Sequence, residues 1–229
     1  MIKKIKKIKK RIKWHFIRTT AALFIMAPFL LGMGPGRAAA AGLAARVQAA
    51  YSGIKDISGN FTQESFLKDL GKKQEYQGRF VIKLPSEMRY IYHGSSEDQV
   101  IIKGGRIIIY QKKEKQALVG RFNAQTYGTA PVALLGGLGK IDTDFKVSEK
   151  KGDLILTPRS PENKITYIKV QPSKGRFPIK SFTIHDMYLN TVKITLKDVS
   201  VNTGVKDQAF EFTPPPGVSV FDYTRQDAN

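Results

Sequence analysis

The sequence of 229 residues contains no cysteine. The chain therefore has no disulfide, no thiolate ligand for a metal and no cysteine nucleophile, and no lipid can be attached to it through a cysteine. A sufficient hydrophobic core must hold the fold together, and a single domain of this length buries enough surface to do so.

Histidine is also scarce, with three residues in the whole chain. His15 lies in the leading segment, and His93 and His185 lie in predicted strands without metal-ligand spacing. No G-x-S-x-G elbow or phosphate-binding loop occurs, and the carboxylate pairs flank predicted turns. We therefore predict no catalytic residues, no metal site, no cofactor and no enzymatic activity.

Acidic residues are absent from the first forty positions, which carry ten basic residues. A short apolar run, Ala21–Met33, follows the basic stretch and precedes an A-x-A site that ends at Ala40. This order is typical of a secretory signal peptide, and the run is shorter than the roughly 20 residues that span a bilayer. We expect residues 1–40 to be cleaved and residues 41–229 to form one soluble exported domain. The alternative is an uncleaved anchor.

The predicted exported domain keeps 28 basic and 19 acidic residues, a net charge of +9. Its lysines are spread along the chain without a nucleic-acid-binding motif, so we predict no nucleic-acid partner. Scattered positive charge favours solubility and anionic surfaces.

Long amphipathic helices are missing after the leader, and two-residue alternation dominates from Ile57 onwards. Before it, Leu43, Val47, Ala50 and Ile54 recur at helical spacing and predict one short helix. The alternation predicts roughly eleven or twelve strands with short links, which favours an antiparallel meander. A sheet of that size curls, so we expect a mainly β fold with an unclosed barrel.

Two features suggest that this barrel has more than a simple core. The segments 98–103 and 106–111 are apolar on both faces, so one face serves a core and the other needs a cover or a ligand. The apolar residues Val132, Leu134 and Leu135 interrupt the alternation in a Gly-flanked segment. Together with the N-terminal helix they can cover the mouth of the sheet, or simply pack on its core.

The stretch AFEFTPPPGVSVFD, residues 209–222, places three prolines between short apolar segments. Proline has no backbone N–H to donate, so this run favours an extended segment that ends or leaves a sheet.

These motifs resemble the outer-membrane lipoprotein carrier family, LolA. FEFTPPPGVSV is similar to the family's terminal F-x-F-x-P-P-x-G-V-x-V signature, and ISGNFTQE to its early F-x-Q strand. GRFVIKLPSEMRYIY resembles the block G-x-(apolar)-P-x-x-(apolar)-R-aromatic, and DQVIIKGGRIIIYQ, TAPVALL, DLILTP and RFPIKSFTI follow in the family's order. The resemblance covers nearly all of residues 41–229.

The resemblance implies an unclosed barrel with a lid of short helices over an apolar cavity. It also implies a monomeric carrier that takes acylated lipoproteins from an inner-membrane lipoprotein-releasing transporter to an outer-membrane acceptor lipoprotein. A carrier of another lipid or glycolipid, or a structural β-domain without a ligand, remains an alternative.

The resemblance and the alternation together predict the site residues. For the cavity we predict Phe80, Ile82, Met88, Tyr90, Val100, Ile102, Ile107 and Ile109, and for the lid Leu43, Val47, Val132, Leu134 and Leu135. Alternation implies that some of the cavity set face outward. Several family members have an arginine where this chain has Leu84, so Arg89 is the predicted lid latch, with a solvated strand residue as the alternative.

Overall fold

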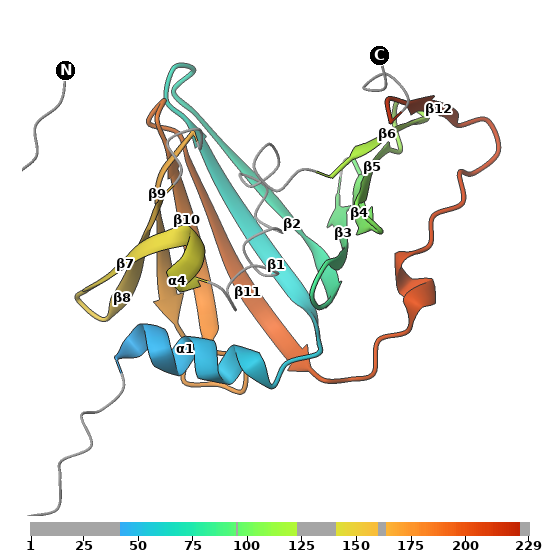
Figure 1. The fold of residues 1–229 in the computed structure, drawn as a ribbon. Coiled ribbons are helices and arrows are strands. Elements are labelled where there is room, and N and C mark those ends of the chain that lie inside the picture. The colour runs from blue at the N-terminus through green and yellow to red at the C-terminus, as the bar shows by residue number, and fades with distance from the viewer. Residues whose placement is uncertain (1–41, 95, 123–140, 160–163, 225–229) are drawn as a thin grey trace, which may run out of the picture. The chain divides into compact units, whose positions relative to one another are not determined.

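The structure is a computed structural model that describes residues 42–94, 96–122, 141–159 and 164–224. The described residues belong to a compact unit, Ala40–Asn229. Its main feature is one sheet of twelve strands (Figure 1). The strands are β1 (Asp56–Leu67), β2 (Lys72–Lys83), β3 (Glu87–His93), β4 (Gln99–Lys103), β5 (Arg106–Gln111), β6 (Gln116–Arg121), β7 (Phe145–Lys150), β8 (Asp153–Pro158), β9 (Ile165–Pro172), β10 (Ile179–Asp186), β11 (Thr191–Val201) and β12 (Ser219–Asp222).

The strand order is β12-β6-β5-β4-β3-β2-β1-β11-β10-β9-β8-β7. Two antiparallel meanders, β1 to β6 and β7 to β11, are joined because β1 pairs with β11. The sheet ends at β12 and β7, which do not pair with each other, so the predicted mainly β, unclosed antiparallel architecture is confirmed. The short strand β12 is the exception in direction, because it runs parallel to β6.

Local sequence explains the tight turns of the first meander. The β4–β5 hairpin turns at Gly104 and Gly105, whose φ angles are +55° and +72°. Both values lie in the left-handed region that glycine adopts without a steric penalty, as predicted for a primed hairpin turn.

The main core lies on one face of the sheet, called the inner face here. It is built by alternate residues of nearly every strand, as expected for a sheet whose side chains have a period of two. The helix α1 (Leu43–Ser52) contributes Val47 and Tyr51, and the short helix α4 (Ile141–Asp144) contributes Ile141. In Figure 1, α1 crosses the ends of β10 and β11.

The opposite face, called the outer face, carries a second, smaller group of buried side chains on strands β4 to β6. We call it the outer cluster, and it comprises Ile101, Tyr110, Ala117, Val119 and Phe210. Phe210 belongs to the 3-10 helix η2 (Asp207–Phe210), which lies in the segment between β11 and β12. Figure 1 shows this C-terminal segment passing outside β3 to β6 before β12 joins the sheet edge.

The C-terminal segment is tied down where it leaves the sheet. The carboxylate of Asp56 accepts hydrogen bonds from the backbone N–H groups of Thr203 (2.7 Å) and Gly204 (3.1 Å) and from the Thr203 hydroxyl (2.9 Å). Burial alone would raise the pKa of Asp56, but these hydrogen bonds together lower it below its ordinary value. The ionised carboxylate therefore anchors the start of the C-terminal segment.

Candidate functional site

The strand register places all eight predicted cavity residues on the inner face. Their cross-strand pairs are Phe80–Tyr90, Ile82–Met88, Met88–Ile102, Tyr90–Val100, Ile102–Ile107 and Val100–Ile109. Six of the eight are buried, whereas Val100 and Ile109 are half-buried. The expectation that some of the set would face outward is therefore wrong, because the three connecting hairpins keep the alternation in phase from β2 to β5.

An aromatic group next to these residues extends the inner face towards β1. The ring of Phe61 lies 5.1 Å from that of Tyr90 and 5.4 Å from that of Tyr92, measured between ring centroids. Gly78 makes room for it, because a Cβ atom there would lie 2.2 Å from the Ile91 carbonyl oxygen and 2.8 Å from the Phe61 ring. Phe61 was not among the predicted cavity residues, although Ile57 and Phe61 are an even number of residues apart in β1 and this spacing could have placed both on one apolar face.

The second meander contributes an equal share of the inner face, which the predicted set omits. Cross-strand pairing aligns its residues with those of β1, because Phe61 lies opposite Leu196 and Ile194 lies opposite Phe182. The buried members on these strands are Leu154, Leu156, Ile165, Ile168, Val170, Ile179, Phe182, Ile184, Ile194 and Leu196. The apolar surface therefore runs across both meanders.

One polar atom on the inner face lacks a hydrogen-bond partner. The Tyr90 side chain is fully buried, and its hydroxyl is the one buried side-chain polar atom left unpaired in the part of the chain that the structure describes. Burial raises the pKa of Tyr90 well above its usual value, so the hydroxyl stays neutral and can donate a hydrogen bond. An unsatisfied buried hydroxyl costs about 1–3 kcal/mol.

Two of the predicted lid residues can be placed. Val47 is buried against the core, and Leu43 is half-buried beside it, so one side of α1 faces the inner face. The other three, Val132, Leu134 and Leu135, lie outside the described residues. Leu84, which stands at the position of the family arginine, packs against the same core.

Arg89 lies on the outer face, since its neighbours Met88 and Tyr90 in β3 point to the inner face. Its guanidinium donates hydrogen bonds to the carbonyl oxygens of Ala209 and Glu211, both at 3.1 Å. It also donates to the side-chain oxygen of Gln99, at 2.6 Å from Nη2. Among the described residues Arg89 therefore holds the C-terminal segment. Its role as a latch of the lid stays a prediction, because Val132, Leu134 and Leu135 lie outside the described residues. Its several partners also distinguish it from a solvated strand residue.

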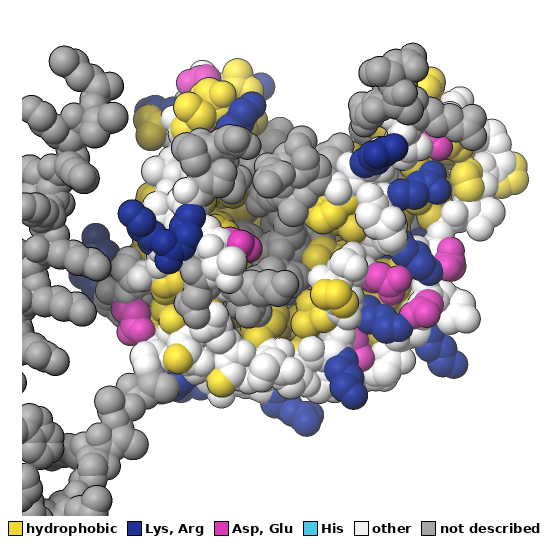
Figure 2. Space-filling view, viewed as in Figure 1, with side chains coloured by type: hydrophobic (Ala, Val, Ile, Leu, Met, Phe, Trp, Pro, Cys, Tyr) yellow, Lys and Arg dark blue, Asp and Glu magenta, His cyan; other side chains and the backbone are white. Residues whose placement is uncertain are grey.

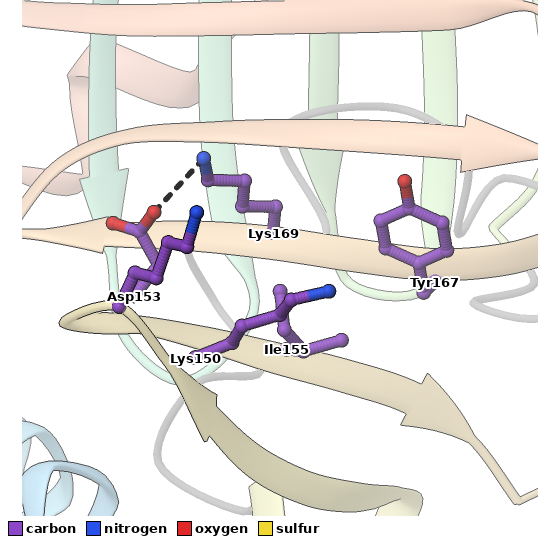
Figure 3. A pocket seen from close by; sticks show the side chains of 6 residues that line it. Lys150, Asp153, Ile155, Tyr167 and Lys169 are labelled. Atoms are coloured by element: carbon purple, nitrogen blue, oxygen red, sulfur yellow. Dashed lines mark ion pairs between the residues drawn. The ribbon is translucent and has the colours of Figure 1, made fainter.

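A pocket of about 460 Å³ lies on the outer face of the second meander (Figure 3). Lys150, Lys151, Asp153, Ile155, Tyr167 and Lys169 line it. The Lys169 ammonium pairs with the Asp153 carboxylate at 2.9 Å, and the Tyr167 ring stacks on His185 at 4.2 Å. This pocket lies on the opposite face of the sheet from the predicted cavity residues.

The described residues were also assessed for metal-binding groups and for membrane-spanning helices. No group of three or more His, Cys, Asp or Glu side chains in the described ranges is arranged to hold a metal ion. Within the same ranges, no helix has the length and apolarity that a bilayer crossing requires.

The sequence was compared with known protein families. Residues 52–213 match the family described as outer membrane lipoprotein carrier protein LolA. The chain belongs to this family. The match begins at the end of α1 and extends past Phe212, so it includes the whole inner face and most of the C-terminal segment of this LolA-family protein.

Curated relatives of this LolA-family chain carry the same description over nearly their whole length. It is 28% identical over 202 residues to an outer-membrane lipoprotein carrier protein of Chromobacterium violaceum, which covers 83% of this chain and 97% of that protein. It is 26% identical over 208 residues to that of Halorhodospira halophila, with 90% and 96% covered. A solved LolA superfamily protein from Nitrosomonas europaea aligns with a TM-score of 0.45 at 10% identity, covering 74% of this chain and 96% of that one.

Proposed function

We propose that this LolA-family protein is a periplasmic carrier that binds the acyl chains of lipoproteins released from the inner membrane and delivers them to the outer membrane. Its partners are then acylated lipoproteins, a releasing transporter and an acceptor lipoprotein, and the carrier acts as a monomer without enzymatic activity. The observation that supports this best is the apolar inner face, to which every predicted cavity residue contributes.

The localisation rests on the N-terminal composition. We propose that residues 1–40 direct export and are then removed. The succession of a basic stretch, a short apolar run and an A-x-A site supports this division.

The energetics of lipid transfer require a surface of this kind. Each methylene transferred from water to an apolar environment contributes about 0.8 kcal/mol. A multiply acylated protein therefore does not cross an aqueous compartment unaided, and its carrier has to replace most of that burial. The inner face offers apolar side chains for the hydrocarbon, and a cover of low local stability allows it to enter and leave.

The Tyr90 hydroxyl favours a bound molecule that carries a hydrogen-bond acceptor. It is a buried neutral donor without an acceptor among the described residues. An acyl chain that enters beside it brings an ester or amide carbonyl, which can accept the missing hydrogen bond. A bound molecule that consists of hydrocarbon alone cannot accept this hydrogen bond.

Binding of a fluorescent triacylated lipopeptide to the purified protein tests the proposal. Val100 and Ile109 face each other on the inner face and are half-buried, so a carboxylate introduced there can reach solvent without unfolding the sheet. We expect Val100→Glu to weaken lipopeptide binding by about tenfold or more, because the charge must be desolvated when hydrocarbon enters.

Ile155→Glu is the matched control, because Ile155 is also half-buried but lies on the outer face, among lysines. It should bind like the parent. Equal binding by all three proteins would overturn the inner face as the acyl site. Mass spectrometry of copurified ligands separates the alternatives, since a free glycolipid would indicate another cargo.

A further inference from the structure

Two neighbouring hairpins expose apolar side chains at their tips. We call this group the hairpin-tip patch, and it comprises Phe66, Leu70, Met187, Tyr188 and Leu189. Leu70 is 63% exposed and Leu189 is 67% exposed. Single exposed apolar residues are normal on a protein surface, but five at the ends of two adjacent hairpins mark a binding surface.

The two hairpins are held together as one unit. Phe66 in β1 lies opposite Thr191 in β11, so the β1–β2 turn and the β10–β11 turn lie side by side at the same end of the strands. The backbone N–H of Lys68 in the first turn donates a 2.9 Å hydrogen bond to the side-chain oxygen of Asn190 in the second. In turn, the Asp186 carboxylate accepts bonds from the N–H groups of Tyr188 (2.9 Å) and Asn190 (2.8 Å). The patch is therefore preorganised.

Leu189 occupies its place at a conformational cost. Its φ angle is +62°, in the left-handed region where a side chain larger than that of Asn is disfavoured. Glycine or asparagine would make this turn with less strain. A leucine that is both strained and two-thirds exposed adds nothing to the core, which indicates that its side chain serves a contact outside the fold.

Basic residues surround the patch. Lys68 and Lys72 flank Leu70 in the first turn, and both are exposed. The exposed residue Lys164 adjoins the second turn, where its carbonyl oxygen accepts a hydrogen bond from the backbone N–H of Met187. The first turn also contains one acidic residue, Asp69. In Figure 2, hydrophobic side chains gather over the hairpin tips with lysine or arginine side chains beside them.

We propose that the hairpin-tip patch inserts into the interface of a bilayer that contains anionic lipids. The patch projects from the ends of hairpins and is not a groove, so a flat, deformable surface suits it better than a peptide or a small ligand. Apolar side chains that enter the acyl boundary and lysines that meet anionic headgroups are the two contributions that give interfacial membrane binding. The inference does not depend on the inner face or on its cargo.

Cosedimentation with lipid vesicles tests this directly. The protein is purified from the periplasm, its N-terminus is determined by mass spectrometry, and all variants share that terminus. We expect it to bind vesicles of phosphatidylglycerol mixed with phosphatidylcholine more tightly than vesicles of phosphatidylcholine alone, with an affinity that falls as salt is added. Leu70→Asp should weaken binding about tenfold or more, and Lys68→Gln about fivefold.

Two further variants separate membrane contact from stability. Leu189→Gly removes the side chain and relieves the positive φ, so the melting temperature should hold or rise while vesicle affinity falls. Phe221→Asp is the matched control, because Phe221 is 44% exposed on β12, at an edge of the sheet. It should bind vesicles like the parent.

Vesicle binding that Leu70→Asp and Leu189→Gly leave unchanged, or no binding to anionic vesicles at all, would overturn the proposal. If the parent instead forms a dimer without lipid and Leu70→Asp abolishes that dimer, the patch belongs to a second copy of the chain, and the membrane assignment is wrong.

Discussion

The two meanders, β1 to β6 and β7 to β11, form two arms of the sheet and bury their faces in different ways. Strands β4 and β5 are apolar on both faces, and the C-terminal segment covers their outer face with Phe210. Strands β8 and β9 alternate, with Leu156 and Ile168 inward, whereas Ile155 and Lys169 face outward. The difference shows that one sheet can have a single core along one arm and two cores along the other.

The origin of the second core lies in the sequence of β5. The three consecutive isoleucines of β5, Ile107 to Ile109, place apolar side chains on both faces of the sheet, whereas buried and exposed residues alternate along most of β9. The inner residues Ile107 and Ile109 belong to the predicted cavity, and the outer residue Tyr110 packs against the ring of Phe212 at 5.3 Å. The second apolar face of this arm is thus covered by the chain's own C-terminal segment.

The largest effect that distinguishes the arms should come from the cover itself. Phe210→Ala removes a fully buried ring and should lower the free energy of unfolding by about 4 kcal/mol. Urea denaturation measures this value. Ile155→Ala, on the open outer face of the other arm, should cost less than half as much because Ile155 is only half-buried. Similar costs for the two variants would mean that the C-terminal segment is not part of the cooperative fold.

A smaller effect, about 2 kcal/mol, is expected for the anchor of the cover. Asp56→Asn removes an ionised acceptor from hydrogen bonds to Thr203, Gly204 and Val205. Because the pKa of Asp56 is lowered in the folded state, its contribution is complete above the ordinary pKa of an aspartate and is lost as the pH falls through the lowered value. The parent should therefore lose this contribution on acidification, whereas Asp56→Asn lacks it at every pH.

Asp153→Asn supplies the comparison on the open arm. Asp153, whose side chain is 16% exposed, pairs with Lys169, whose side chain is 48% exposed, and ion pairs near a protein surface contribute about 0.5 kcal/mol. Unfolding free energies measured from pH 7 down to acid pH should differ between parent and Asp56→Asn most at neutral pH. A difference that is constant with pH would contradict the role assigned to the Asp56 carboxylate.

An effect of about 1 kcal/mol, smaller than that of Asp56→Asn, is expected for Arg89→Leu. The variant loses hydrogen bonds to the Ala209 and Glu211 carbonyls, but leucine adds apolar contact at a partly exposed position. Lipopeptide binding should remain at the parental level, because Arg89 lies on the outer face. Impaired uptake or release with unchanged stability would instead support the predicted role as a latch of the lid.

The spacing of apolar residues, together with the positions of glycine and proline, was sufficient to predict most of the fold. It indicated α1 through Leu43 and Val47, the hairpin at Gly104 and Gly105, and the unclosed antiparallel sheet, because each of these depends on neighbours in the chain. It did not indicate that the residues after the prolines pair with β6. A proline run predicts where a strand stops, but the partner of the next strand depends on where the chain is led in space.

Some residues of the candidate site could likewise be predicted from the sequence, and others could not. The eight inner-face residues from Phe80 to Ile109 could be chosen from their pattern, but Phe61 and the residues of β8 to β11 join them only through the pairing of β1 with β11. Arg89 shows the same limit, since its contacts with the C-terminal segment follow from its face of β3 and not from its motif position.

By itself, the sequence determined the period of each strand, the positions of its turns and the family to which the chain belongs, because these are encoded in residues that are close together or in a fixed order. Tertiary structure decided which face each strand turns towards the core, which apolar surface the chain covers with its own C-terminal segment, and which apolar side chains remain at the hairpin tips. The reason is that burial depends on contacts between segments distant in sequence, such as Asp56 with Thr203 or Lys68 with Asn190.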